Sequence, residues 1–210
     1  MTRGTILPDT GIVALAPEDA PAIAGVLADA FREDPAFKLI FASTERGQDL
    51  HYHRFMEAWV AHAIEEGNPL FGVRSDDDLA AVLGIAGLDG RAPQWSLRRN
   101  LWRMLKVLPG MRLRKALAMA AATRRPGDMP SRVAEISMLA VRTNYQGHGL
   151  AAALLSHAHG LVAAASSQSH IYLYTTSPGA NLFYAKQGYK LVAERQVESA
   201  AVFHLLRCCD

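Results

Sequence analysis

A strand, a glycine-containing turn and a helix follow one another between residues 133 and 164, and this order places the strongest constraint on the fold. The apolar run 133–141 predicts a buried strand, and the alanine-rich run 150–164 predicts a helix. The polar turn between them holds Gly147 and Gly149, which let the backbone come close to a ligand. A helix start presents unpaired N–H groups and the positive end of the helix dipole. The segment therefore predicts an α/β fold with a turn that can bind a pyrophosphate.

Two other phosphate-binding motifs are excluded at this turn. It lacks the Gly-Lys-Ser/Thr sequence of a Walker loop, and the Gly-x-Gly-x-x-Gly pattern fails at Ala152. Residues 143–185 include no Asp, Glu, Lys or Arg, so a highly anionic ligand can bind there only through backbone N–H groups. An ordinary tight turn between a strand and a helix stays open as the alternative.

Helical and strand patterns continue on both sides of this unit. Strands are predicted at residues 12–16, 70–74, 79–87, 170–175, 189–196 and 200–207, and helices at 17–31, 51–66, 97–108, 111–122 and 178–187. Helices between strands, together with hairpins, predict an α/β fold with a mixed sheet of about seven strands and helices on both faces. The helical pair at 97–122 is an extra feature before the central strand. At about 100–200 residues per domain, we expect a single domain, 1–210.

Charged side chains are distributed unevenly along the chain. Residues 1–89 carry a net charge of −9, whereas residues 90–127 carry 10 basic and no acidic side chains. Such a basic block attracts an anionic ligand or partner. A solvated helix surface that faces the acidic N-terminal third is the alternative. Trp95 and Trp102 are the only aromatic residues of the block, and we therefore expect no nucleic-acid partner.

The cysteine count and the apolar runs indicate a cellular compartment. The two cysteines, Cys208 and Cys209, exclude a disulfide framework and a four-cysteine zinc site, which fits a reducing, cytoplasmic environment. The N-terminus lacks the apolar core of a signal peptide. No run reaches the roughly 18 apolar residues of a membrane span, so we expect no membrane partner.

The histidines predict no metal site. His51 and His53, like His157 and His159, stand two residues apart, which places their rings on different faces of a helix. His148, in the glycine turn, is expected to contribute its backbone N–H group rather than to act as a base.

Two motifs, about 35 residues apart, resemble those of the GNAT superfamily of acetyl-CoA-dependent N-acetyltransferases. Gln146-Gly-His-Gly-Leu-Ala151 is similar to the family's Gln/Arg-x-x-Gly-x-Gly/Ala pyrophosphate motif, and residues 181–189 are similar to its Asn-x-x-Phe-Tyr-x-Lys-x-Gly-Phe ending. The resemblance covers residues 133–196, which would form the acetyl-CoA-binding and catalytic core. The helices at 97–122 lengthen the usual connection, as in the puromycin-type antibiotic-inactivating members, and we expect them to cover the acceptor side.

The resemblance implies which residues bind acetyl-CoA. The strand residues Leu139, Ala140 and Val141 would lie along the pantetheine arm. The pyrophosphate would be held by the turn and helix start, which comprise Gln146, Gly147, His148, Gly149, Leu150 and Ala151. Asn181 would hydrogen-bond the pantetheine arm, with a polar contact at a helix start as the alternative.

Two side chains are candidates for proton transfer. Glu135 is a lone carboxylate in an apolar strand, which is costly unless it has a partner or a task. By its distance from the glycine motif it also resembles the glutamate base of histone-type members. An ion pair with a basic residue such as Arg112, or a place at a solvated strand end, is the alternative. Tyr184 stands where the family's thiolate-protonating tyrosine lies, and a core aromatic is its alternative.

The resemblance implies an N-acetyltransferase that moves an acetyl group from acetyl-CoA to a primary amine of a small molecule. Because the matched region holds no cysteine or serine with a plausible base, we expect direct transfer in a ternary complex. One alternative is that the acceptor is a protein N-terminus or a lysine. Another is that the chain is a non-catalytic acyl-CoA-binding module. The acceptor's identity, the acyl chain length and a homodimer are left undetermined.

Overall fold

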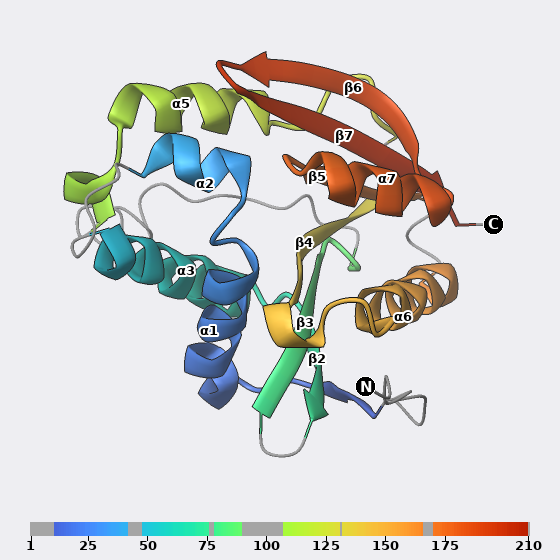
Figure 1. Ribbon diagram of the computed structural model, residues 1–210. Helices are drawn as coiled ribbons and strands as arrows, with labels where there is room; N and C mark the ends of the chain where they lie inside the picture. Colours follow the sequence, from blue (N-terminus) through green and yellow to red (C-terminus); the bar gives the residue numbers. More distant parts are fainter. Residues whose placement is uncertain are drawn as a thin grey trace, which may run out of the picture.

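The computed structural model describes residues 11–41, 48–75, 78–89, 107–130, 132–165 and 170–209. Its strands are β1 (Ile12–Ala14), β2 (Leu70–Ser75), β3 (Asp78–Ala86), β4 (Val133–Val141), β5 (His170–Thr175), β6 (Lys190–Val197) and β7 (Ala200–Cys208). They form one seven-stranded sheet in the order β1-β2-β3-β4-β5-β7-β6 (Figure 1). Neighbouring strands run antiparallel, except that β4 and β5 run parallel. The predicted mixed α/β sheet is confirmed.

Six helices are described around the sheet. They are α1 (Ala20–Ala30), α2 (Pro35–Ile40), α3 (Gln48–Glu65), α5 (Leu113–Ala122), α6 (Leu150–Ala164) and α7 (Pro178–Lys186). Five of them were predicted within a few residues. Of the predicted helix 97–108, residues 97–106 lie outside the described part of the chain, and Leu108–Gly110 forms a short 3-10 turn.

The short helix α2 was not predicted. Asp34 and Pro35 were interpreted only as the end of the first helix, and α1 does end before them. The same two residues also begin α2, because the Asp34 carboxylate accepts a hydrogen bond from the Ala36 N–H at 2.8 Å and proline fits the first helical position. A dipeptide that stops one helix can therefore start the next.

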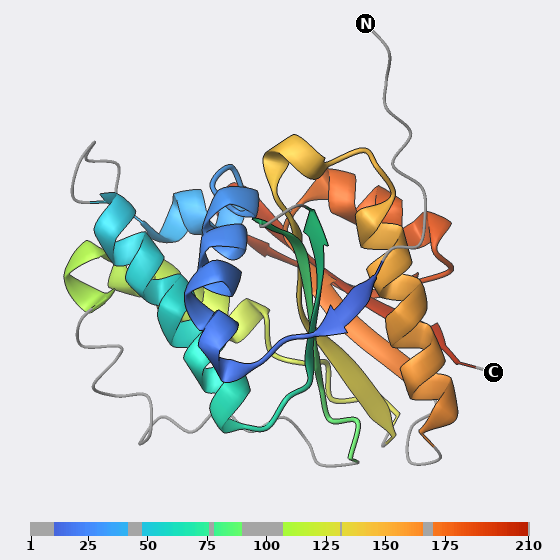
Figure 2. The same cartoon turned by 90° about the horizontal axis from the view of Figure 1, so that it is seen from below.

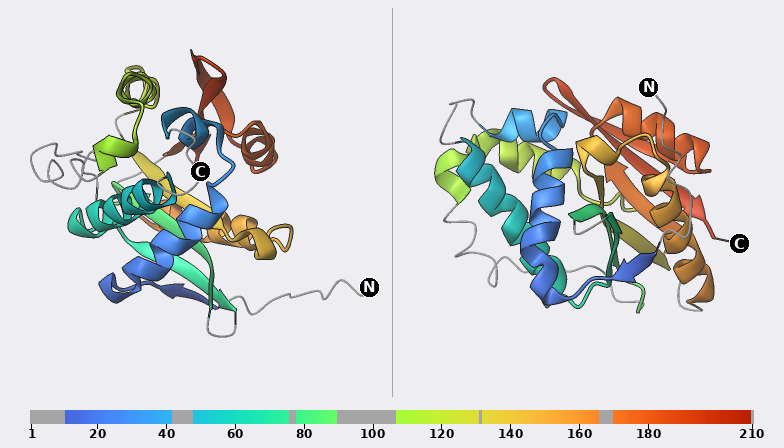
Figure 3. Two further views of the ribbon diagram at one scale, coloured as in Figure 1. Left: turned by 60° about the vertical axis from the view of Figure 1, so that its left-hand side comes forward. Right: turned by 60° about the horizontal axis from the view of Figure 1, so that its bottom comes forward.

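Helices cover both faces of the sheet and create two separate apolar cores (Figure 2). On one face, α1, α2, α3 and α5 pack over side chains such as Val82, Met138 and Val202. On the other face, α6 and α7 pack over Leu83, Ile136 and others. The helix α5 lies at the end of the sheet formed by β6 and β7, far from α6 (Figure 3).

Candidate active site

The two parallel strands at the centre of the sheet separate along their length. They pair only over Val133–Glu135 of β4 and His170–Tyr172 of β5, although β4 continues for six residues beyond Glu135 to Val141. Past this point β4 and β5 are no longer paired, and this parting of the two strands is called the opening below. The edge of a strand that has parted from its neighbour can hydrogen-bond an extended ligand. Leu139, Ala140 and Val141, the predicted pantetheine contacts, belong to this free segment.

A β-bulge lies at the start of the opening. Ile85 of β3 pairs with Ile136, whereas Gly84 pairs with Met138, so Ser137 is an extra residue in β4. The Ser137 hydroxyl is buried and has no hydrogen-bond partner in the described part of the chain. A bulge redirects the strand and changes which backbone groups face the partner strands. Sequence periodicity gave no sign of this irregularity.

The glycine turn has the geometry of an anion-binding helix start. Gly147 and Gly149 have φ angles of 79° and 82°, in the left-handed region that other L-residues avoid. A Cβ atom at either position would meet no atom within 4 Å, so the space in front of the turn is open. Gly149 caps the 15-residue helix α6 without any side-chain cap, which leaves the first N–H groups of the helix available to a ligand.

Three contacts hold the turn in place from behind. Gln146 Nε2 donates to the Val141 carbonyl at 3.1 Å, and Arg142 Nε donates to the Leu79 carbonyl at 2.8 Å. The Thr143 N–H donates at 2.7 Å to the carboxylate of Asp29 in α1, a bond that lowers the pKa of Asp29. The side chain of Gln146 thus shapes the turn, while the exposed ring of His148 makes no hydrogen bond within the described residues.

Glu135 lies where β4 and β5 part, and its partner differs from the one considered from sequence. Its Oε2 lies 3.3 Å from Nη2 of Arg125, which follows α5, so the alternative of an ion pair with a basic residue is found, with Arg125 in place of Arg112. The sequence offered no way to choose between these arginines, because both flank the same helix. Burial raises the pKa of the Glu135 carboxyl, and the Arg125 guanidinium opposes that shift.

A hydrogen-bonded chain of buried groups extends from this ion pair. The Arg125 guanidinium lies 5.3 Å from the ring centre of Tyr172, which pairs with Glu135 across the strands. The Tyr172 hydroxyl donates at 2.7 Å to Nδ1 of His204, and His204 Nε2 donates at 2.9 Å to the Ala122 carbonyl. This chain ties Glu135 to the end of α5, and neither Tyr172 nor His204 had been singled out from the sequence.

Asp34 is a second carboxylate on this side that sequence reasoning missed as a functional group. Its two oxygens each lie 2.8 Å from the Thr176 hydroxyl at the end of β5. Burial raises its pKa, while the bonds from Thr176 and from the backbone lower it. Because these donors occupy it, Asp34 fixes the α1–α2 connection over the end of β5.

Tyr184 and Asn181 both belong to α7, on the other face of the sheet. Tyr184 is buried in the same cluster as Ile136 and Leu154, and its hydroxyl has no hydrogen-bond partner among the residues described. Burial raises the pKa of Tyr184, so the phenol stays protonated. Asn181 stands one turn earlier and is half-buried. The structure therefore brings Tyr184, the glycine turn and the free edge of β4 to the α6–α7 face, and Glu135 to the opposite face at the same opening.

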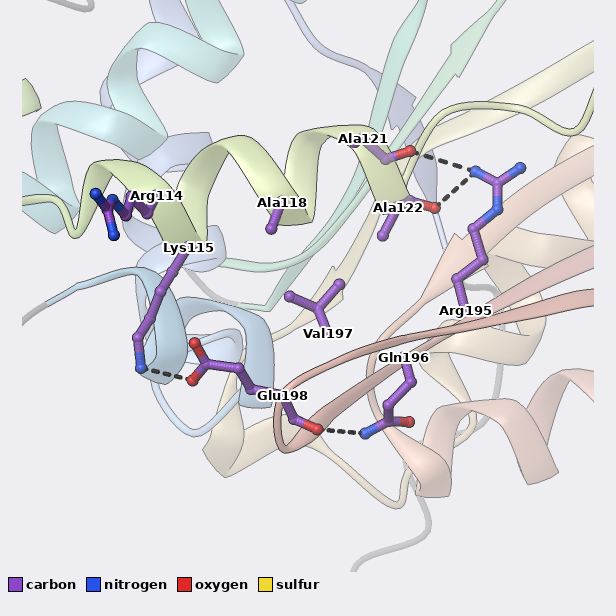
Figure 4. Close-up of a pocket in the computed structure, with 9 residues that line it drawn as sticks. All are labelled: Arg114, Lys115, Ala118, Ala121, Ala122, Arg195, Gln196, Val197 and Glu198. Atoms are coloured by element: carbon purple, nitrogen blue, oxygen red, sulfur yellow. Dashed lines mark hydrogen bonds and ion pairs between the residues drawn. The ribbon is translucent and has the colours of Figure 1, made fainter.

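A groove of about 570 Å³ lies elsewhere, between α5 and the β6–β7 hairpin (Figure 4). It is lined by Arg114, Lys115, Ala118, Ala121, Ala122, Arg195, Gln196, Val197 and Glu198. Lys115 pairs with Glu198 at 2.6 Å across it. None of the predicted site residues lines this groove, so it is separate from the opening between β4 and β5.

No metal centre or membrane span is found in the described residues. No group of three or more His, Cys, Asp or Glu side chains is placed to hold a metal ion within the ranges given above. Across the same ranges, no helix is both long and apolar enough to cross a bilayer.

Comparisons with known proteins agree with this architecture. Residues 110–191 match the family model described as Acetyltransferase (GNAT) domain. A search of curated proteins finds no match. Among solved structures, a Corynebacterium glutamicum protein named histone acetyltransferase HPA2 and related acetyltransferase is similar, with a TM-score of 0.63 and 18% identity over 93% of this chain and 94% of that one.

Two further solved structures show the same fold. A GCN5-related N-acetyltransferase from Rhodopseudomonas palustris aligns with a TM-score of 0.58 and 15% identity, covering 97% of this chain and 98% of that one. The ribosomal-protein-S18-alanine N-acetyltransferase of Escherichia coli aligns with a TM-score of 0.57 and 15% identity, covering 95% and 93%. The fold and the family match define an acyltransferase. The family match over residues 110–191 and the shared fold support membership of the GNAT superfamily, whose members use acetyl-CoA as co-substrate.

Proposed function

We propose that this chain transfers an acetyl group from acetyl-CoA to a primary amine of a small molecule, directly and within a ternary complex. The observation that carries the proposal is the separation of β4 and β5 immediately after Glu135 and Tyr172. The opening would join a turn suited to anion binding to a half-buried carboxylate.

The residues at the turn fit a CoA pyrophosphate. The uncapped start of α6 and the open space at Gly147 and Gly149 leave room for phosphate oxygens against backbone N–H groups. No acidic side chain lies between residues 143 and 185 to repel them. The pantetheine arm would lie along Leu139, Ala140 and Val141, with Asn181 as a polar contact. When bound, the co-substrate supplies an activated acetyl thioester.

Glu135 is proposed as the base that removes a proton from the acceptor amine, directly or through a water. A raised pKa makes a carboxylate a stronger base, which suits proton removal near neutral pH. Backbone N–H groups near Leu139–Val141 would polarise the thioester carbonyl. The amide C–N bond forms as the C–S bond breaks, and the sulfur keeps the bonding electrons.

Tyr184 is proposed as the proton donor to the departing sulfur. Its raised pKa keeps the O–H group available as a donor at neutral pH. Complete transfer of the proton to a thiolate is uphill for such a phenol, and the geometry therefore favours a hydrogen bond that strengthens as charge develops. The free hydroxyl of Tyr184 leaves this donor uncommitted within the described structure.

Direct transfer is supported because, among the described residues, no activated nucleophile lies near the opening. Ser137 lies at the bulge, but its hydroxyl contacts no base in the ranges that the structure describes. A serine nucleophile needs an adjacent base. Initial-rate patterns that intersect would agree with a ternary complex, whereas ping-pong patterns or an acetylated protein isolated without acceptor would contradict it.

A panel of small amines, peptides with free N-termini and lysine peptides, incubated with acetyl-CoA, tests the function itself. Release of free thiol that requires a small amine supports the proposal. Release only with peptides would favour a protein acceptor, and acetyl-CoA binding without any release would favour a non-catalytic module. We further propose one catalytic unit over 1–210 and a cytoplasmic location, which the presence of only two cysteines in the sequence supports.

A further inference from the structure

The ion pair between Arg125 and Glu135 leaves most of its hydrogen-bonding capacity unused. One contact joins the two side chains, from Nη2 of Arg125 to Oε2 of Glu135 at 3.3 Å. Strong pairs of this type are bidentate and closer to 2.7–2.9 Å. Among the described residues, no other hydrogen bond is recorded to the remaining N–H groups of Arg125 or to the second oxygen of Glu135.

Both side chains also remain partly accessible. The Arg125 side chain is 27% exposed and that of Glu135 is 20% exposed, so neither is sealed in the core. The face of the Tyr172 ring supports the guanidinium and restricts its position. A cation and an anion therefore lie side by side at the opening. They are held in place, and both keep unused hydrogen-bonding capacity.

Two other charged groups on this side, Arg195 and Asp34, are already engaged in hydrogen bonds. Nη1 of Arg195 donates to the carbonyls of Ala122 and Arg124 at 3.1 and 2.7 Å. Asp34 is occupied by the Thr176 hydroxyl and by a backbone N–H group. A ligand that reaches the opening thus meets a cationic and an anionic group that are paired with each other through a single contact.

We propose that the acceptor is an α-amino acid, whose carboxylate binds Arg125 while its amine lies at Glu135. This inference rests on the proposed function, because it assigns to Glu135 the amine that is acetylated. In an α-amino acid a single carbon separates the amine from the carboxylate. This short spacing matches Glu135 and Arg125, which are in direct contact. A simple amine would bring a second positive charge next to Arg125 without an anion to offset it.

Arg125 would act as a specificity-determining residue in this arrangement. Guanidinium groups bind carboxylates through two parallel N–H bonds, and Arg125 has the donors for this. Arg125 belongs to the segment that follows α5, within the basic block of residues 90–127. The extra helical region would then contribute to acceptor choice through one side chain rather than through its overall charge.

The test compares three acceptors that share one side chain: the best substrate among the twenty standard L-amino acids, its carboxamide and its decarboxylated amine. Thiol release from acetyl-CoA gives kcat/KM for each. We expect the amino acid to exceed both analogues by about 10- to 100-fold, the range for a hydrogen bond to a charged group. In Arg125→Gln this preference should fall to about 1-fold, and the decarboxylated amine should react as well as before or better.

Arg124→Gln is the matched control, since the Arg124 side chain is exposed and only its backbone N–H and carbonyl groups are hydrogen-bonded. It should keep the preference. If the Arg125 variant slows all three acceptors equally, Arg125 has a structural role and the proposal is overturned. Acetylation of simple amines without acetylation of amino acids would overturn it as well. If none of the acceptors leads to thiol release, the proposed acetyltransferase function fails, and this outcome does not by itself test the preference for an amino acid. Calorimetry of the same three compounds with the CoA-loaded protein then tests the preference alone, and equal affinities would overturn it.

Discussion

The Tyr189 hydroxyl lies 3.1 Å from Nε2 of His159, which joins the end of α7 to the middle of α6. The Tyr189 ring also packs edge-on against Tyr184, with ring centres 5.7 Å apart. The helix that would hold the pyrophosphate is thus linked through two rings to the helix that carries the proposed acid. His159 and Tyr189 are positioning residues in this arrangement, since neither reaches the opening itself.

Replacing His159 by Phe should lower the free energy of unfolding by about 1 kcal/mol, the value of a lost hydrogen bond. It should also reduce kcat more than the KM for acetyl-CoA, because Tyr184 loses its support. Urea unfolding and initial rates measure the two effects. Ser156→Ala, at an exposed position of the same helix, should change neither quantity. An unchanged kcat in the His159 variant would show that the link has no role in positioning Tyr184.

The same histidine predicts a pH dependence of stability. Burial, with the nearby positive charge of Arg207, lowers the pKa of His159 to about 4. Between pH 6.5 and 4 the unfolded chain binds a proton that the folded chain does not, so stability falls as pH decreases through this window. His159→Phe should lose stability less steeply there. Parallel unfolding curves for the two proteins would contradict the assignment.

Gly149→Glu should abolish acetyl-CoA binding, because a side chain and a negative charge would enter the open space before α6. The φ angle of 82° adds strain of about 1–2 kcal/mol for any other L-residue. Gly149→Ala therefore measures the strain alone. Gly160→Glu is the charge control, since this glycine is exposed within α6 and has free space around it. Calorimetric affinity for CoA that survives Gly149→Glu would place the binding site elsewhere.

Tyr184→Phe should lower kcat by about 10²- to 10⁴-fold with little change in acetyl-CoA affinity. The fold should tolerate it well, because the hydroxyl has no hydrogen-bond partner in the described residues and the ring is retained. Thermal unfolding and single-turnover rates check both points. Parent-like turnover would reject Tyr184 as the donor.

Glu135→Gln should reduce kcat/KM most at pH values where the acceptor amine is still protonated, because a free amine needs no base. In the parent, the raised pKa of Glu135 should move the acidic limb of the pH–rate profile above that of an ordinary glutamate. Glu194→Gln, at an exposed position of β6, is the control. Equal loss at every pH would argue against a role as base.

Several features of this protein follow from local sequence. The apolar runs, the glycine turn and the helix caps depend on neighbouring residues, and the sequence therefore predicted all seven strands and the turn at Gly147 and Gly149. Glycine permits the left-handed φ angles found at these two positions. The family motifs also lie within short stretches, and this is why the superfamily could be inferred before the fold was known.

Tertiary structure alone decided which distant groups meet. The parting of β4 and β5, the extra residue Ser137 and the pairing of Glu135 with Arg125 depend on how strands and helices pack, which no local periodicity encodes. The choice of Arg125 over Arg112 illustrates the reason. Both arginines flank α5 and have the same chemistry, and only the docking of the end of α5 against His204 and Arg195 brings Arg125 to the carboxylate.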